Sequence, residues 1–392
     1  MTYDFDTIID RHGTGALKTD TLQERYGAQD LIPLWVADMD FATPPFIVDA
    51  IRERTLHPIY GYTIVPDEYW TAIEDWIAIH HNWKVEREWL RYIPGIVKGI
   101  GMAINVFVAP DEKVIIQPPV YHPFRLVPLG NDRKVVYNPL IHHDDGSYSM
   151  DLNNLEQVAE DDKCRMLILS NPHNPGGIVW DKDTLECLAD ICHRRHIIVI
   201  SDEIHGDMTL WNHRHTPFAS VSDKAADCSI TFGAPSKTFN IAGIVSSYSI
   251  VPNDTLRRKF YTWLMANEMD APDIFAPIAT IAAFTKGEAW RQEMLAYVED
   301  NIDLVIDFLA AYTPKLRPLR PQASFLIWID CRPLGIPHRE LLDLFINKAH
   351  LALNDGAMFG PGGEGFMRLN VATPRAILLK ALNQLKEAIG TL

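Results

Sequence analysis

Residues 165–205, RMLILSNPHNPGGIVWDKDTLECLADICHRRHIIVISDEIH, decide the fold class. Two short β-branched apolar runs in this stretch, at 165–170 and 196–203, are typical of buried strands. Residues 183–196 lie between them and have the pattern of a helix. We expect that helix to open with a capping-box-like Asp-x-x-Glu at Asp183 and to close with basic residues that complement the helix dipole. The order strand, helix, strand predicts a parallel pair joined by a crossover helix.

Further apolar runs outside this stretch have the same continuous character. They are KVIIQ (113–117), SITFGA (229–234) and SYSIV (247–251). Continuous β-branched strands suit a sheet that is covered on both faces. The sequence therefore predicts an α/β fold with a mostly parallel, doubly wound sheet in its larger domain.

The last hundred residues have a different pattern, which is typical of a smaller α+β domain. We expect helices near 287–312 and 338–349 and at the C-terminus, and strands at SFLIWID (324–330) and GFMRLN (365–370). The first fifty residues are irregular and Pro-rich, and they can pack with either part. We expect residues 48–286 to form the large domain, and residues 1–47 with 287–392 to form the small one.

The composition argues against several classes of protein. The 392 residues are 47% apolar and 22% charged, and 51 acidic against 36 basic residues give a formal charge of −15. Such a surface repels nucleic acid, and no apolar run approaches the roughly 20 residues of a membrane helix. The acidic first residues, MTYDFDTIID, lack the basic segment followed by an apolar segment that a secretion signal has, so we expect a cytoplasmic protein. The five scattered cysteines indicate reduced structural thiols rather than a metal site.

Three motifs follow predicted strands directly: NPHNPGG (171–177), DEIH (202–205) and PSKTFNIAG (235–243). Open α/β sheets bind ligands at the carboxyl ends of their strands, so the motifs are expected to meet in one cleft. Each is weak alone, because most lysines are surface residues and an acid at a strand end is often only a helix cap. The ordered trio of Asn174, Asp202 and Lys237 is far more specific.

This trio resembles the fold-type I pyridoxal-phosphate enzymes, the aminotransferase class I/II superfamily. Within it, the chain is most similar to the cystathionine β-lyase branch that includes MalY, PatB and cystalysin. The resemblance covers nearly the whole chain, and its motifs stand in the order WVADMDF (35–41), YGYT (60–63), PPVYHPF (118–124), SNPHNPGG (170–177), SDEIH (201–205), APSKTFNIAG (234–243) and GFMRLN (365–370).

The resemblance implies roles for the residues around the cofactor ring. Lys237 would carry pyridoxal 5'-phosphate as a Schiff base and act as general base. Asp202 would pair with the pyridine nitrogen and keep it protonated, so that the ring can accept electrons. Asn174 would donate a hydrogen bond to the phenolate oxygen, and its peptide bond to Pro175 is a candidate cis bond. Tyr121 would stack on the ring.

The phosphate and the substrate would be held by other residues. Within GIVKGIG (95–101), Val97 and Lys98 are expected at a helix start whose amides bind phosphate, with Ser236 as a further contact. Tyr62 matches a residue that reaches the neighbouring subunit's phosphate, which implies a homodimer with shared active sites.

On the substrate side, Arg368 matches the arginine that binds the α-carboxylate, and Ala37 and Asp38 would flank the same end. The chain departs from many aminotransferases at two positions. Val245 stands where they have a phosphate-binding arginine, and His205 stands where they have tyrosine. His205 would then contact the cofactor near its phenolate, or serve the structure alone.

The implied reaction is α,β-elimination. Lys237 would remove the Cα proton, and Lys237 or a tyrosine such as Tyr121 would protonate the departing sulfur; Tyr62 is a further catalytic candidate. The products would be pyruvate, ammonia and a thiol from a small sulfur amino acid whose identity the sequence leaves open. One alternative is an amino-acid aminotransferase, since Lys237, Asp202 and Arg368 serve both reactions. Another is a lyase that also binds a regulatory protein. No metal is expected.

Overall fold

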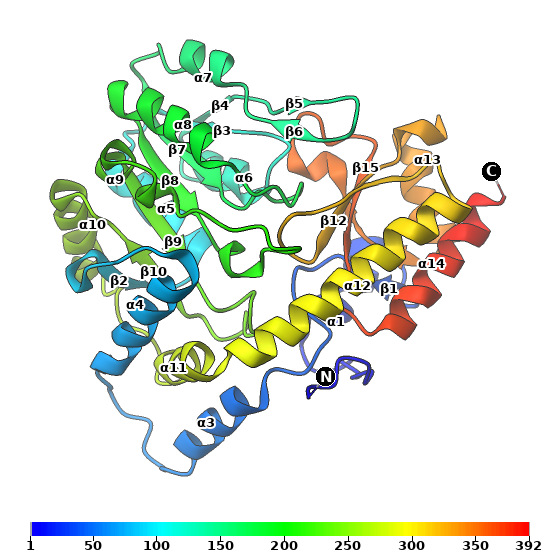
Figure 1. Cartoon of the computed structure of the whole chain (residues 1–392), viewed down its shortest axis with the longest axis horizontal. Helices are drawn as coiled ribbons and strands as arrows, with labels where there is room; N and C mark the ends of the chain where they lie inside the picture. The colour runs from blue at the N-terminus through cyan, green and yellow to red at the C-terminus, as the bar shows by residue number, and fades with distance from the viewer. Residues whose placement is uncertain (1, 392) are drawn as a thin grey trace.

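The computed structural model describes residues 2–391, and a seven-stranded sheet forms its centre. The strands run in the order β2-β10-β9-β8-β7-β3-β4, and all except β10 point the same way (Figure 1). In that order they are Leu90–Ile93, Ser247–Ile250, Ser229–Gly233, Ile198–Asp202, Cys164–Ser170, Lys113–Ile116 and Lys134–Tyr137. The mostly parallel α/β sheet expected from the sequence is thus confirmed.

Alternate residues of the strands bury themselves in two different apolar clusters. In β7, Met166 and Ile168 face the cluster that contains α5 and α10, whereas Leu167 and Leu169 face the one that contains α8. All four side chains are fully buried, which explains why the strand is a continuous apolar run. The covering helices are α5 (Ile96–Phe107), α6 (Pro123–Gly130) and α10 (Asp254–Ala266) on one face, and α7 (Leu152–Val158), α8 (Lys182–Arg194) and α9 (Asp223–Cys228) on the other.

Two local expectations need correction. Strand β10 is antiparallel to both of its neighbours, because the thirteen residues 234–246 return the chain to the sheet without the crossover helix that a parallel strand requires. Helix α8 is capped by Asp181 and not by Asp183. The Asp181 carboxylate accepts the backbone N–H of Thr184 at 2.8 Å, and its backbone is extended, as an N-cap requires.

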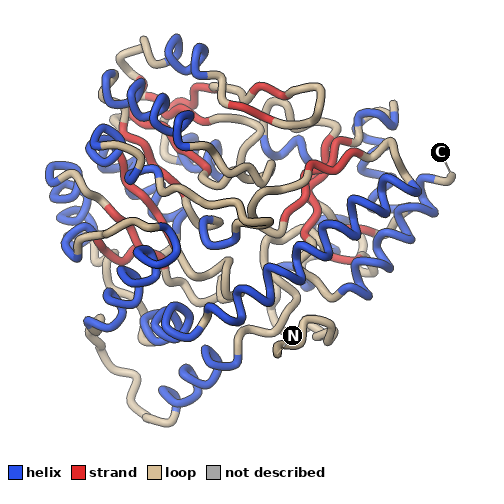
Figure 2. The backbone as a smooth tube through the Cα atoms, in the orientation of Figure 1, coloured by secondary structure: helices blue, strands red, loops and turns tan. Residues whose placement is uncertain are grey.

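A second, antiparallel sheet lies beside the C-terminal helices (Figure 2). Its strands, in order, are β11 (Arg317–Leu319), β12 (Leu326–Asp330), β15 (Phe366–Asn370) and β14 (Asn354–Asp355). The helices of this part are α12 (Glu288–Tyr312), α13 (His338–Asp343) and α14 (Arg375–Ile389). The helix expected over 338–349 is shorter, since residues 344–348 form a π-helical turn.

The N-terminal region contacts both parts of the molecule. Strand β1 (Ile32–Pro33) pairs with β13 (Leu351–Ala352), while α3 (Pro45–Thr55) and α4 (Asp67–His81) pack against α11 (Ala276–Lys286). The remaining elements are the short helices α1 (Leu17–Asp20) and α2 (Leu22–Tyr26) and the hairpin of β5 (Ile141–His142) and β6 (Tyr148–Ser149). The domain division expected from the sequence stays a prediction.

Two further observations bear on the class of protein. No helix within residues 2–391 is long and apolar enough to cross a membrane. All five cysteine thiols are free, and four of them are buried. Over the same residues, no cluster of three or more His, Cys, Asp or Glu side chains has an arrangement that would hold a metal ion.

Candidate active site

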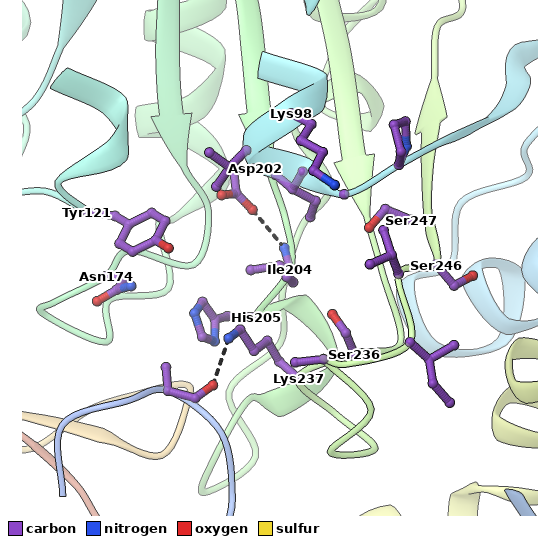
Figure 3. A pocket seen from close by; sticks show the side chains of 18 of the residues that line it. Lys98, Tyr121, Asn174, Asp202, Ile204, His205, Ser236, Lys237, Ser246 and Ser247 are labelled. Atoms are coloured by element: carbon purple, nitrogen blue, oxygen red, sulfur yellow. Dashed lines mark hydrogen bonds between the residues drawn. The ribbon is translucent and has the colours of Figure 1, made fainter. Parts of the chain in front are cut away.

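A cavity of about 270 Å³ lies at the carboxyl ends of β7, β8 and β9 (Figure 3). Ser170 and Asp202 are the last residues of β7 and β8, and Lys237 follows β9 by four residues. Since β10 runs the other way, its first residue, Ser247, lies at the same edge. The three sequence motifs therefore converge as expected, and the antiparallel strand adds a fourth wall.

Nine of the twelve predicted site residues line this cavity. They are Ala37, Val97, Lys98, Tyr121, Asn174, Asp202, His205, Ser236 and Lys237. Arg368 lies just behind the wall, hydrogen-bonded to Asn174, and Asp38 follows Ala37. Tyr62 is fully exposed in the segment between α3 and α4 and does not line the cavity of its own chain. Its role toward a neighbouring subunit stays a prediction.

Lys237 extends into the cavity from the turn that follows β9 (Figure 3). Its Nζ donates a hydrogen bond to the Ala37 carbonyl at 2.7 Å. Burial lowers the pKa of Lys237 to about 8; the charge of Asp38 opposes this shift and that of Arg368 adds to it. A substantial fraction of the amine is therefore neutral in mildly alkaline solution, as a nucleophile or a base requires.

Asp202 faces Lys237 across the cavity, and its carboxyl group is buried at the strand end (Figure 3). One carboxyl oxygen accepts the backbone N–H of Ile204 at 3.2 Å. Burial raises the pKa of Asp202 to about 7, although the Ile204 N–H and Lys237 act against that shift. A cation placed against this carboxyl group would restore the ionised form, which suits a partner such as a protonated ring nitrogen.

The first turn of α5 lines one part of the cavity with Gly95, Ile96, Val97 and Lys98. Gly95 precedes the helix with φ +104°, a conformation that favours glycine, and it lets the backbone turn sharply into Ile96. The first amides of a helix have no partner within it and bind anions. Lys98 and Ser236 reach the same cavity (Figure 3), whereas Val245 contributes only an apolar wall.

Arg368 is buried, and no carboxylate among residues 2–391 pairs with it. Its Nη1 donates to the Asn174 side-chain oxygen at 2.9 Å, and its Nη2 donates to the Asn354 side-chain oxygen at 2.6 Å and the Trp35 carbonyl at 3.2 Å. The guanidinium lies 4.9 Å from the Phe359 ring centre, and its Nε has no partner within residues 2–391. A buried cation that is held only by neutral acceptors is ready to bind an anion.

Asn174 links the arginine to the cavity. Because its side-chain oxygen accepts from Arg368, its amide N–H groups are directed to the cavity side, as a donor to a phenolate oxygen would be. The expected cis peptide bond between Asn174 and Pro175 is present. The cis bonds at Pro118–Pro119 and Asn171–Pro172 were not expected.

Tyr121 and His205 occupy the wall beside Asn174 (Figure 3). The Tyr121 backbone N–H donates to the Asn174 carbonyl at 3.0 Å, and burial raises the pKa of its hydroxyl. Burial lowers the pKa of His205 to about 3, so its ring is neutral, and its Nδ1 has no partner among the described residues. The contact of His205 with a cofactor stays a prediction.

Two residues in or next to the cavity wall were not foreseen from the sequence. Ser247 lines the cavity because the antiparallel direction of β10 places its first residue there. Asn354 belongs to the two-residue strand β14 and accepts a hydrogen bond from Arg368. Neither has a sequence signal of its own, although a connection of 234–246 without helical periodicity could have revealed the reversal of β10.

These features define a pyridoxal-phosphate type of site on an α/β sheet, and the comparisons identify the family. Residues 29–385 match the family of class I and II aminotransferases, so the chain belongs to that family. It is 41% identical to cystathionine beta-lyase PatB of Bacillus subtilis, over 98% of this chain and all of that one. It is 34% identical to protein MalY of Escherichia coli, over 99% of both chains. The crystal structure of cystalysin from Treponema denticola, which contains pyridoxal 5'-phosphate, matches all of both chains with a TM-score of 0.96 and 32% identity.

Proposed function

We propose that the protein is a pyridoxal-phosphate-dependent carbon–sulfur lyase of the cystathionine β-lyase type. It cleaves the Cβ–S bond of a small sulfur amino acid by α,β-elimination, which releases a thiol and aminoacrylate; water then hydrolyses the aminoacrylate to pyruvate and ammonia. The observation that carries the proposal is the placement of Lys237 in one cavity with Asp202 and beside Arg368. The choice of reaction rests on the full-length similarity to PatB.

The residues of the cavity fit the cofactor. Lys237 would bind its aldehyde carbon, Asp202 would pair with its ring nitrogen, and the start of α5 with Lys98 would hold its phosphate. When bound, pyridoxal phosphate supplies an electron sink for the pair left at Cα. Asp202 would keep the ring nitrogen protonated, and that charge would in turn keep Asp202 ionised in spite of its burial.

The chain's own residues bind the substrate and move its protons. Arg368 binds the α-carboxylate through its guanidinium fork, which orients the Cα–H bond toward Lys237. The amine of Lys237 accepts the Cα proton, and the Ala37 carbonyl orients that amine. The departing sulfur takes a proton from Lys237 or from Tyr121, which lines the same cavity.

Incubation of the enzyme with L-cystathionine tests the reaction type. Stoichiometric pyruvate and free thiol are expected. Amino transfer to a keto acid without thiol release would make the protein an aminotransferase, because the same lysine, aspartate and arginine serve both reactions. A panel of cystathionine, cystine, cysteine and an S-alkyl cysteine would then identify the preferred sulfur substrate.

Covalent capture of the cofactor by the full-length apoprotein is expected to rise with pH and to reach half its limit near pH 8. The reason is that the amine attacks only when neutral, and burial lowers the pKa of Lys237 to about 8. Borohydride trapping followed by mass spectrometry of the peptide with Lys237 measures the rate at each pH. A midpoint above pH 10, the range of an ordinary lysine, would contradict the described environment.

Substitution Arg368→Lys is expected to raise the KM for L-cystathionine by about 10- to 100-fold, because a lysine ammonium cannot bind a carboxylate bidentately. Steady-state pyruvate release measures the effect. The matched control is Arg339→Lys, at an exposed arginine in α13 away from the cavity, and it should leave KM unchanged. An unchanged KM in the Arg368→Lys enzyme would remove this residue from substrate binding.

We also propose a homodimer in the cytoplasm. Residues 56–64 expose five large apolar side chains, which are Leu56, Ile59, Tyr60, Tyr62 and Ile64, and such a group on a surface is typical of a protein contact. Substitution of both Ile59 and Ile64 by Ser is expected to shift sedimentation toward the monomer and to reduce activity. A wild-type protein that sediments as a monomer would contradict the proposal.

A further inference from the structure

Residues 35–41, WVADMDF, contact both residues on which the proposed function depends. The Ala37 carbonyl accepts the hydrogen bond from Lys237 at 2.7 Å, and two residues earlier the Trp35 carbonyl accepts one from Arg368 at 3.2 Å. The segment has no regular secondary structure. Its placement therefore depends on side chains that come from elsewhere.

Two asparagines that lie far apart in the sequence, Asn240 and Asn370, hold the backbone of this segment. The Asn370 amide, at the end of β15, donates to the carbonyls of Val36 and Asp38 at 2.6 and 2.7 Å. The Asn240 side chain accepts the backbone N–H of Met39 at 2.9 Å. Both asparagines bind only backbone groups of the segment, so neither fixes its carboxylates.

Two basic residues of the N-terminal region bind those carboxylates. Arg11 forms a bidentate ion pair with Asp38, with distances of 2.6 and 3.0 Å, and also reaches Asp40 at 3.0 Å. The Lys18 side chain has no exposed surface; its Nζ lies 2.9 Å from both Asp40 oxygens and 3.6 Å from an Asp38 oxygen. Two cations and two anions are thus balanced in a site that is mostly removed from water.

We propose that Arg11 and Lys18 are positioning residues that hold residues 35–41 against Lys237, so that the Ala37 carbonyl and the Asp38 carboxylate keep their places beside the amine. The inference rests on the proposed function. The inference goes beyond the proposed function because it assigns a role in the reaction to Arg11 and Lys18, which do not line the cavity. Bidentate geometry fixes a carboxylate more firmly than a single contact does.

The role has an electrostatic signature. The charged and titratable groups that act on Lys237 are Asp38, Asp202 and Arg368, and the neutral His205 ring lies beside them. Asp38 favours the protonated amine. If Arg11 holds Asp38 in place, its loss lets that partly exposed carboxylate turn toward water, and the amine loses the attraction.

The test measures the pH midpoint of covalent pyridoxal-phosphate capture by the full-length apoprotein. Arg11→Gln and Asp38→Asn should each lower the midpoint, by about 0.3–1 unit, and the double substitution should lower it no further. Arg11→Lys should restore part of the shift. In the holoenzyme, Arg11→Gln should lower kcat for L-cystathionine by about 3- to 30-fold with a smaller change in KM. The matched control is Arg52→Gln, which breaks an exposed ion pair with Asp49.

The possible results distinguish a failure of the positioning role from a failure of the proposed function. An unchanged or raised midpoint in Arg11→Gln overturns the positioning role, since a raised one would mean that Arg11 only neutralises Asp38. Thermal melting shows whether each variant is folded. If the Arg11→Gln protein is not folded, an unchanged midpoint in the Asp38→Asn protein would still overturn the proposal, because Asp38 would then not act on the amine. Failure of the wild-type apoprotein to capture the cofactor would overturn the proposed function itself.

Discussion

Substitution Lys237→Ala is expected to lower kcat for β-elimination by about 10²–10⁴-fold, the usual contribution of a positioned acid or base. Lys237 is the cavity amine that donates a hydrogen bond to the Ala37 carbonyl and faces Asp202. No neighbour replaces it, because Lys98 lies in the first turn of α5 and His205 is held neutral by burial. Pyruvate release under single-turnover conditions measures the loss of the chemical step.

Two controls separate catalysis from folding. Lys182→Ala removes an exposed lysine of α8 and should leave turnover unchanged. Borohydride should fix the cofactor in the wild-type chain but not in the Lys237→Ala chain, while both chains melt at similar temperatures. If the Lys237→Ala enzyme kept more than about a tenth of the wild-type rate, the assignment of this lysine as the proton carrier would be wrong.

Substitution Asp202→Asn is expected to act in opposite directions on turnover and on apoprotein stability. Turnover should fall by about 10²–10³-fold, because an amide cannot hold a proton on the ring nitrogen and a preorganised charge is lost. Stability should rise, since burial raises the pKa of Asp202 from 3.8 to about 7. The folded chain then binds more protons than the unfolded one between these values, so its stability falls as pH rises through that window.

Urea unfolding of the apoproteins at pH 5 and pH 8 measures the second effect. The Asn variant should gain up to about 4 kcal/mol over wild type at pH 8, and less at pH 5. Asp183→Asn, at an exposed position in the first turn of α8, is the matched control and should show no pH-dependent gain. An equal difference between wild type and Asp202→Asn at both pH values would show that Asp202 ionises normally in the apoprotein.

The sheet could be predicted from the sequence because burial on both faces leaves continuous apolar runs, of which β7 is the clearest. Strand direction could not be predicted in the same way. The strand β10 is as fully buried as its neighbour β9, and only the connection before it determines that it is antiparallel.

The position of Asp202 and Lys237 in the candidate site could be predicted because the first ends a strand and the second follows one closely. Arg368 lies within a strand and was predicted only through the family resemblance. Contacts between distant charges had no such signal. Arg11 and Lys18 lie 27 and 22 residues before the carboxylates they bind, Asp38 and Asp40, and no periodicity links them. Ion pairs of this kind depend on tertiary packing, which a local pattern does not encode.

The guanidinium of Arg368, which has only neutral hydrogen-bond partners among the described residues, should affect how the protein behaves in ordinary buffers. Its hydrogen-bond partners, Asn174 and Asn354, carry no charge, so any small monocarboxylate that enters the cavity meets an uncompensated cation. Mass action then stabilises the folded chain by RT ln(1 + [L]/Kd). Acetate or formate buffers are therefore expected to compete with the amino acid and to raise the melting temperature. Phosphate is expected to bind instead at the start of α5, where it would compete with the phosphate group of the cofactor. The choice of buffer therefore decides which part of the cavity the buffer anion occupies.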